Sequence, residues 1–180
     1  MNEVEIVVKI PEKTEVTVQG FKVLVSGSKG KVEKDFSSPL FNKEVKITKE
    51  THTVKVHSES MKRKIKSQVG GVAAHIRNMI KGVNSGYSAK MKIVFMHFPV
   101  TAKVAGKEVT VSNFLGEKAP RRAEIIGDTK VEIKGEEIFV SGIDKEAVSQ
   151  TAANIETATR VSARDRRVFQ DGIFVTEKVN

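Results

Sequence analysis

The chain has no cysteine and no long apolar run, and these absences narrow the classes of protein to which it can belong. Without cysteine among its 180 residues, disulfide bonds and thiolate chemistry are excluded, and a reducing cytoplasm is the natural location. No apolar stretch approaches the roughly 20 residues that a membrane-spanning helix needs. The first residues, Met1 to Glu5, lack a basic start followed by an apolar run, so we expect no secretory signal.

Motifs for catalysis or metal binding are also missing. The four histidines have no metal-ligand spacing: His52, His57, His75 and His97. The sequence contains no P-loop, and Glu136–Glu137 fits an exposed hairpin turn better than a pair of catalytic carboxylates. Gly27–Gly30 matches the G-x-x-G of KH domains, but it lies between two strand patterns, so a hairpin turn is the better interpretation. We expect no enzymatic activity, no metal ion and no cofactor.

Positive charge is abundant and unevenly distributed. The chain has 31 basic and 22 acidic residues, a net charge of +9 and a pI near 9.7, which favours an anionic partner. Residues 1–82 contain 16 basic and 9 acidic residues, whereas residues 123–159 contain 3 basic and 8 acidic residues. The positive charge of the second half therefore lies in the segments that flank 123–159. This segregation predicts one face that meets phosphate and another that meets water or a basic neighbour.

The spacing of apolar residues predicts short strands and two helices. Alternation indicates strands near residues 4–8, 16–18, 23–25, 45–47, 54–56, 91–95, 109–111, 131–133, 138–140 and 173–175. Apolar residues from Ile65 to Ile80 follow a helical stripe of about five turns, with Ser58 or Ser60 able to cap its start and Gly82 its end. Asp144 is expected to cap a second helix that extends to Thr159.

The same order of elements recurs at a nearly constant offset. Val23 and Val109 are 86 residues apart, and the offset of later matches drifts to 80 between Ile93 and Ile173. Duplication with small loop deletions would leave this pattern, so we predict an α+β protein of two similar units, each a mainly antiparallel sheet packed against one helix. The expected domains are residues 1–85, completed by a strand near 89–97, and residues 98–180.

A cluster of four arginines lies between the second predicted helix and the last strand: Arg160, Arg164, Arg166 and Arg167. Arginine offers a planar fork of donors that suits phosphate oxygens. The dipole of a helix end favours one or two cations there, but it does not account for four. Asp165 is expected to orient an arginine, and Asp171 to be a turn residue before the strand. The cluster predicts contact with a nucleic acid.

A second basic motif spans residues 112–122. It contains three cations, Lys118, Arg121 and Arg122, together with a flexible glycine and a stiff proline. Gly116 allows the backbone to approach a ligand closely. Phe114 either stacks on a base or anchors the loop in the core, and its place near a strand end favours the core.

These two motifs resemble those of the archaeal and eukaryotic type of large-subunit ribosomal protein six. The likeness is carried by residues 113–118 with Arg121 and Arg122, and by residues 167–175 followed by Lys178, and it extends over essentially the whole chain. Position 174 is Phe where that family more often has Tyr. The resemblance implies a cytoplasmic, structural constituent of the large ribosomal subunit that binds 23S-type rRNA near the stalk base and the factor-binding region. It also implies that the second unit makes the main rRNA contacts and stabilises rRNA tertiary structure.

The resemblance also suggests which residues and partners take part. The expected rRNA contacts are Lys118, Arg121, Arg122, Arg160, Arg164, Arg166, Arg167 and Lys178. The expected partners are large-subunit rRNA and neighbouring ribosomal proteins near the stalk base, with no membrane and no small-molecule substrate. The alternative is a non-ribosomal RNA chaperone or RNA-processing factor with a basic docking surface.

Overall fold

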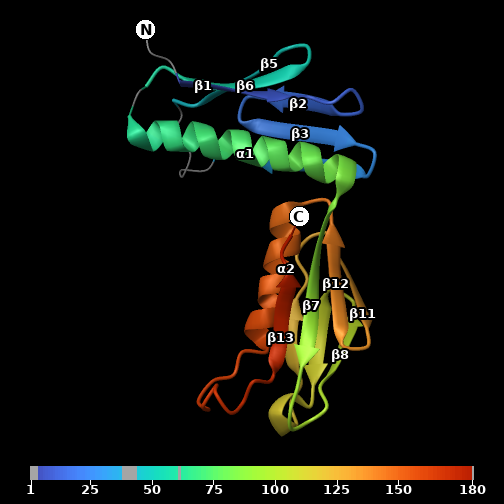
Figure 1. Ribbon diagram of the computed structural model, residues 1–180. Helices are drawn as coiled ribbons and strands as arrows, with labels where there is room; N and C mark the ends of the chain where they lie inside the picture. Colours follow the sequence, from blue (N-terminus) through green and yellow to red (C-terminus); the bar gives the residue numbers. More distant parts are fainter. Residues whose placement is uncertain (1–3, 38–43, 61, 180) are drawn as a thin grey trace. The chain divides into compact units, whose positions relative to one another are not determined.

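The computed structural model describes residues 4–37, 44–60 and 62–179. The chain divides into two compact units, Met1–Gly86 and Tyr87–Asn180. Each unit contains one α-helix and antiparallel strands (Figure 1), which confirms the predicted α+β class. No helix within the described ranges is long and apolar enough to cross a membrane.

The first unit holds two three-stranded sheets and one long helix. Its elements are β1 (Val4–Lys9), β2 (Glu15–Gln19), β3 (Lys22–Gly27), β4 (Gly30–Asp35), β5 (Lys46–Lys49), β6 (Thr53–Ser58) and α1 (Arg63–Ser85). The sheets have the orders β1-β6-β5 and β2-β3-β4, and α1 packs against both. Gly27 lies opposite Gly30 in the β3–β4 hairpin, as expected for a turn and not for a KH loop.

Helix α1 begins and ends later than the sequence indicates. Ser58 is fully buried in β6, so the chain is still extended there and neither predicted serine caps the helix. The N-cap is Lys62, whose side chain makes no capping hydrogen bond. The helix continues past Gly82 and stops at Gly86, whose φ of +75° suits glycine.

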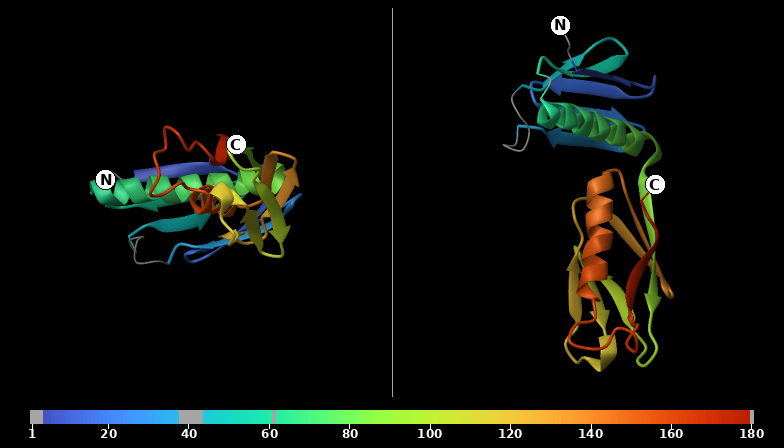
Figure 2. Two further views of the ribbon diagram at one scale, coloured as in Figure 1. Left: turned by 90° about the horizontal axis from the view of Figure 1, so that it is seen from below. Right: turned by 60° about the vertical axis from the view of Figure 1, so that its left-hand side comes forward.

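The second unit repeats this plan and adds one strand. Its elements are β7 (Tyr87–Val94), β8 (Thr101–Ala105), β9 (Glu108–Ser112), the 3₁₀ turn η1 (Phe114–Gly116), β10 (Arg121–Glu124), β11 (Lys130–Lys134), β12 (Glu137–Gly142), α2 (Lys145–Ala158) and β13 (Gly172–Glu177). The sheets have the orders β11-β12-β7-β13 and β10-β9-β8. Helix α2 packs against strands of both sheets and runs beside β13 and β7 (Figures 1 and 2).

Strand β7 belongs to the second unit, so the prediction that a strand near 89–97 completes the first unit is wrong. Met91 of β7 lies opposite Ile138 in β12 and Val175 in β13. In the first unit, β1 occupies the equivalent place beside β6. Strand β7 is therefore the counterpart of β1, and β13 has no counterpart among the described strands of the first unit. The prediction failed because β7 and β13 share the same alternation of apolar residues.

Candidate nucleic-acid interface

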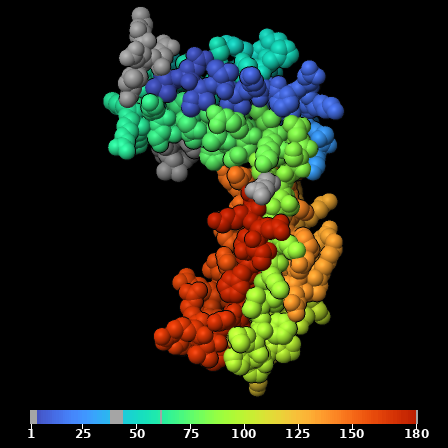
Figure 3. Space-filling model, viewed as in Figure 1, coloured from blue at the N-terminus to red at the C-terminus, as the bar shows by residue number. Residues whose placement is uncertain are grey.

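Three loops meet at one end of the second unit. They are the β7–β8 loop (residues 95–100), the η1 segment with the loop after it (113–120) and the α2–β13 loop (159–171). Asn113 donates a hydrogen bond from Nδ2 to the carbonyl oxygen of Pro99 at 3.0 Å, which fastens the first two loops together. The rings of His97 and Phe169 lie 5.3 Å apart and connect the first loop to the third. Figure 3 shows the third loop, in red, at the surface of the unit.

Arg121 joins the second and third loops through a network of hydrogen bonds. Its Nε and Nη2 atoms donate to the Glu117 carboxylate at 2.8 and 2.6 Å. Its Nη1 atom donates to the carbonyl oxygens of Ala158 and Arg160, both at 3.0 Å. The guanidinium lies 4.3 Å from the centre of the buried Phe114 ring. Arg121 is therefore engaged within the protein, at the place where α2 ends.

The charges of this network shift the pKa values of its members. The hydrogen bond from Arg121 lowers the pKa of the Glu117 carboxyl, and the nearby positive charge of Arg164 lowers it further. The same hydrogen bond raises the pKa of Arg121. Since Arg164 acts on Glu117, the third loop places positive charge beside the second.

Phe114 anchors η1 in the core, as the sequence favoured. It is 1 % exposed and packs among the buried residues of the second unit. Asn113 and Leu115, on either side of it, have φ values of +59° and +51°, a left-handed conformation that is unusual for a leucine. The burial of Phe114 and Leu115 holds this strained turn in place.

Two arginines of the α2–β13 loop have partners within that loop. Arg167 donates from Nε and Nη2 to the two carboxylate oxygens of Asp165, at 3.1 and 2.9 Å. The expectation that Asp165 orients an arginine is thus confirmed, and this hydrogen bond lowers the pKa of Asp165. The Arg164 guanidinium lies 4.9 Å from the centre of the Phe169 ring. Both guanidinium groups remain exposed, so they are oriented but open to a ligand.

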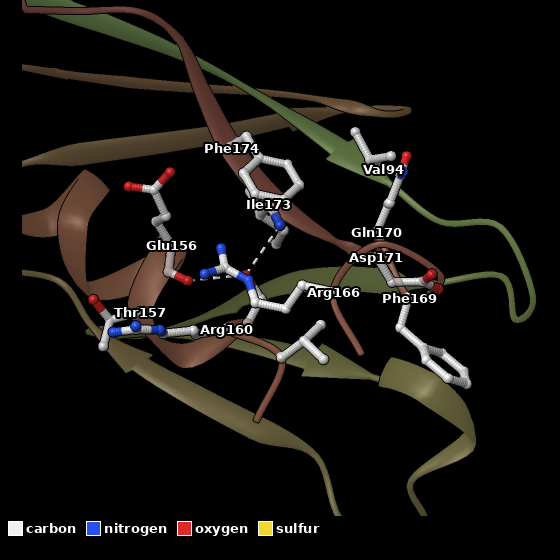
Figure 4. A pocket seen from close by; sticks show the side chains of 12 residues that line it. Val94, Glu156, Thr157, Arg160, Arg166, Phe169, Gln170, Asp171, Ile173 and Phe174 are labelled. Atoms are coloured by element: carbon white, nitrogen blue, oxygen red, sulfur yellow. Dashed lines mark hydrogen bonds between the residues drawn. The ribbon is translucent and has the colours of Figure 1, made fainter. Parts of the chain in front are cut away.

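Three further cations are exposed and unpaired. The side chains of Lys118, Arg160 and Arg166 form no hydrogen bond or ion pair within the described ranges. Arg160 and Arg166 line a pocket of about 530 Å³ between the end of α2 and the start of β13. Figure 4 shows the Arg166 guanidinium directed toward the end of α2, where Arg160 also lies. We call Lys118, Arg160, Arg164, Arg166 and Arg167 the basic end.

Thr159 attaches the end of α2 to the start of β13. Its hydroxyl donates to the carbonyl oxygens of Ile155 and Glu156, at 3.2 and 3.3 Å. The same oxygen accepts a hydrogen bond from the backbone N–H of Ile173 at 3.0 Å. Because Thr159 is 1 % exposed, these bonds are shielded from water. The α2–β13 loop is therefore fastened at both of its ends.

Asp171, which the sequence predicted as a turn residue, is buried just before β13. Its side chain is fully buried, and Oδ2 accepts a hydrogen bond from the backbone N–H of Met96 at 3.4 Å. Oδ1 lies 3.8 Å from Nδ1 of His97 and has no hydrogen-bond partner within the described ranges. Asp171 thereby connects the α2–β13 loop to the β7–β8 loop.

Two predicted contact residues lie apart from the basic end. Arg122 points to the opposite face of β10 from Arg121, and its nearest acidic partner is Glu108 at 3.9 Å. Lys178 follows β13, whose first residue adjoins the basic end. At about 3.3 Å per residue, this places Lys178 roughly 20 Å along the strand from Gly172.

Sequence reasoning missed the exposed apolar residues beside the basic end. Met96 and Phe98 in the β7–β8 loop are 64 % and 43 % exposed, and Val168 in the α2–β13 loop is 55 % exposed. The Phe98 ring packs 3.3 Å from the point where a Cβ on Gly116 would lie, so Gly116 permits this close contact. The signal in the sequence was the run Phe95-Met-His-Phe98 after an alternating strand. The described residues contain no cluster of three or more acids or histidines suited to hold a metal ion.

Comparison with known proteins gives consistent matches along the chain. The family model described as ribosomal protein L6 matches twice, at residues 10–86 and 98–172. The large ribosomal subunit protein uL6 of Aeropyrum pernix is 48 % identical over 171 residues, which cover 95 % of this chain and 92 % of that protein. The uL6 of Desulfurococcus amylolyticus is 50 % identical over 173 residues, with 95 % and 92 % covered. The uL6 of Methanothrix thermoacetophila is 45 % identical over 169 residues, with 94 % of each covered.

Proposed function

Since the chain belongs to the ribosomal protein L6 family, we propose that it binds large-subunit (23S-type) rRNA through the basic end of its second unit. Membership of this family makes it a structural, non-enzymatic protein of the large ribosomal subunit. Its place there, by likeness to the family, is near the stalk base and the factor-binding region, beside neighbouring ribosomal proteins. Its role is to stabilise the folded rRNA.

The observation that carries this proposal is a set of cations without acidic partners in the described part of the chain, borne by loops that hydrogen bonds hold in place. Lys118, Arg160 and Arg166 have no acidic partner within the described ranges, while Arg121 and Thr159 fix the segments that bear them. Phosphate oxygens supply the missing partners, and each contact releases counterions from the RNA. Because the backbone segments that bear the cations are held before binding, these loops lose little conformational entropy when RNA docks.

The basic end and the neighbouring Arg121 have different roles. Arg121 positions the loops and does not itself meet a phosphate, since its donors serve Glu117 and two carbonyl oxygens. Arg164 and Arg167 are pre-oriented by Phe169 and Asp165. The deep, narrow major groove of A-form RNA excludes side chains, so the arginines read backbone shape rather than base sequence.

Exposed apolar side chains beside the cations add a second kind of contact. Met96 and Phe98 present apolar surface that suits an unstacked base or a sugar. The remaining surface of the second unit differs, because residues 123–159 carry 3 basic and 8 acidic residues. That acidic surface faces water or a basic neighbouring protein, while the basic end faces rRNA.

Replacement of the unpaired cations by glutamine tests the proposal without disturbing a described side-chain contact. In filter-binding titrations of large-subunit rRNA over a range of KCl concentrations, we expect the Lys118→Gln, Arg160→Gln, Arg166→Gln variant to lower the slope of log Kd against log salt by about 2. The matched control is Lys103→Gln, Lys107→Gln, Lys130→Gln, three exposed lysines of the same unit outside the basic end. Equal losses in the two variants would overturn the proposal.

A second measurement separates the ribosomal role from the alternative of a free RNA chaperone or processing factor. The chain is followed by mass spectrometry through a sucrose gradient before and after a high-salt wash. Stoichiometric retention on the large subunit is the expected result. Release into the light fractions would favour the chaperone or processing factor.

A further inference from the structure

Helix α1 carries only positive charge on its exposed surface. Its 23 residues include Arg63, Lys64, Lys66, Arg77 and Lys81 and no acidic residue. The equivalent helix of the second unit, α2, has Lys145 with two acids, Glu146 and Glu156. Each helix packs against the two sheets of its own unit in the same way. Since α2 does so with acidic residues on its surface, packing does not require that all charged residues of α1 be basic.

Most of this charge has no ion-pair partner among the described residues. Arg63, Lys64, Lys66 and Arg77 form no ion pair within the described ranges. Helix N-termini favour acidic side chains, yet the first turn of α1 has none and its N-cap makes no capping bond. By contrast, the Asp144 carboxylate caps α2 by accepting a hydrogen bond from the Glu146 backbone N–H, and Glu146 is an acid in its first turn. The charges on the surface of α1 therefore do not stabilise the helix itself.

Six residues along one side of α1 form a straight stripe with two cations at each end. Its members are spaced by three or four residues, which places them on a single helix face: Arg63, Lys66, Gly70, Ala74, Arg77 and Lys81. At 1.5 Å per residue the stripe is about 27 Å long. In the space-filling view α1, in green, lies at the surface of the first unit (Figure 3).

The middle of the stripe carries only small residues, and no contact among the described residues requires this. A Cβ atom added at Gly70, or at the adjacent Gly71, would meet no atom of the described residues within 4 Å. Glycine in a helix interior is less favourable than alanine, and here no packed neighbour requires it. Two adjacent glycines at an open position instead leave room for an outside molecule to approach the helix backbone.

We propose that this stripe of α1 is a second RNA-binding surface, on which the sugar–phosphate backbone of rRNA lies close to Gly70, Gly71 and Ala74. The cations at the two ends of the stripe bind phosphates. The inference rests on the proposed function and extends it to the first unit. A protein partner fits less well, because the exposed large apolar residues of the described chain include none from α1, and protein interfaces need such residues at their centre.

Three full-length variants test the proposal. Arg63→Gln, Lys66→Gln, Arg77→Gln removes end cations, and Gly70→Ala, Gly71→Ala fills the middle. The control Lys9→Gln, Lys13→Gln, Lys49→Gln removes three exposed lysines of the same unit outside α1. In salt titrations with large-subunit rRNA, we expect the first variant to lower the log–log slope by about 2 and the control to leave it unchanged. We expect the alanine variant to weaken binding while raising the Tm of the free protein by several degrees.

A chemical probe locates the RNA directly. The chain has no cysteine, so Ser67→Cys, beside the stripe, can carry a single iron chelate for hydroxyl-radical cleavage in reconstituted large subunits. Scission of rRNA from this position is expected. Absence of scission, or an alanine variant that binds as tightly as the native chain, would overturn the inference. If only the basic-end variant loses affinity, the proposed function stands and the α1 surface does not; if neither loses affinity, both are wrong.

Discussion

Arg121 and Glu117 form a two-bonded fork with N···O distances of 2.8 and 2.6 Å, at the junction of the loops that bear the basic end. The same guanidinium reaches carbonyl oxygens that lie 37 and 39 residues further along the chain. The Arg121 guanidinium therefore joins two segments that lie far apart in the sequence. Arg121 is thus engaged by hydrogen bonds within the protein.

The first prediction concerns the structural role of Arg121. Arg121→Ala should lower the free energy of unfolding of the second unit by about 2 kcal/mol, because it removes charged hydrogen bonds from a site that is less than a quarter exposed. The neighbouring Arg122→Ala should change it by no more than about 0.5 kcal/mol. Urea denaturation followed by circular dichroism measures both. Similar values for the two variants would contradict the assignment.

The second prediction is a dependence on pH. The pKa of Glu117 is lowered from its ordinary value of 4.5 by Arg121, so its ionised form favours the folded state. This contribution is present above pH 4.5 and is lost as the pH falls through the lowered pKa. Thermal melts across this range should show a shallower loss of stability on acidification for Glu117→Gln than for the native chain. Parallel curves would show that the fork does not contribute.

The third prediction tests the bond between α2 and β13. Thr159→Val keeps the shape of the side chain but leaves the buried N–H of Ile173 without its acceptor, at a cost of about 1–3 kcal/mol. Hydrogen exchange should accelerate at Ile173 and in the α2–β13 loop. Thr176→Val, which removes an exposed hydroxyl bond to the Lys90 carbonyl in the same strand, is the control. Unchanged exchange at Ile173 in Thr159→Val would refute the role.

The fourth prediction contrasts two glycines of the first unit. A Cβ at Gly27 would lie 2.7 Å from Cγ2 of Val83 and 3.0 Å from its carbonyl oxygen, so Gly27→Ala should destabilise the unit by about 1–3 kcal/mol. Gly70→Ala meets no neighbour and should stabilise it by about 0.5–1 kcal/mol. Urea denaturation of the two variants should give free-energy changes of opposite sign. A loss of stability in Gly70→Ala would show an unseen constraint on that residue.

Sequence periodicity predicted the elements whose apolar residues face a core. The stripe from Ile65 to Ile80 is buried on α1, and the alternation of Ile138 and Val140 is buried in β12. Strand β10, with the sequence Arg-Arg-Ala-Glu, carries no such alternation and is held by its pairing with β9. Strand β10 forms because it pairs with β9, so the alternation of apolar residues within its own sequence did not predict it.

The sequence predicted which cations gather near the basic end, but it did not predict that Arg121 and the members of the basic end have different partners. Arg121, Arg164 and Arg166 are the same residue type, yet Arg121 is engaged by Glu117, Arg164 stacks on Phe169 and Arg166 has no partner among the described residues. Those differences arise from contacts between distant segments. Asp171 shows the same limit, because only the fold reveals that the backbone of Met96 donates to it.

The place of β13 has a consequence for biosynthesis. Gly172, which opens this strand, is translated 85 residues after Tyr87, which opens the strand that it pairs with. The first unit has all its described strands and helix once Ser85 has left the exit tunnel, whereas the α2–β13 loop stays untethered at its far end until β13 emerges. Because domains fold in order during synthesis, the nascent chain matures from its first unit toward its last strand.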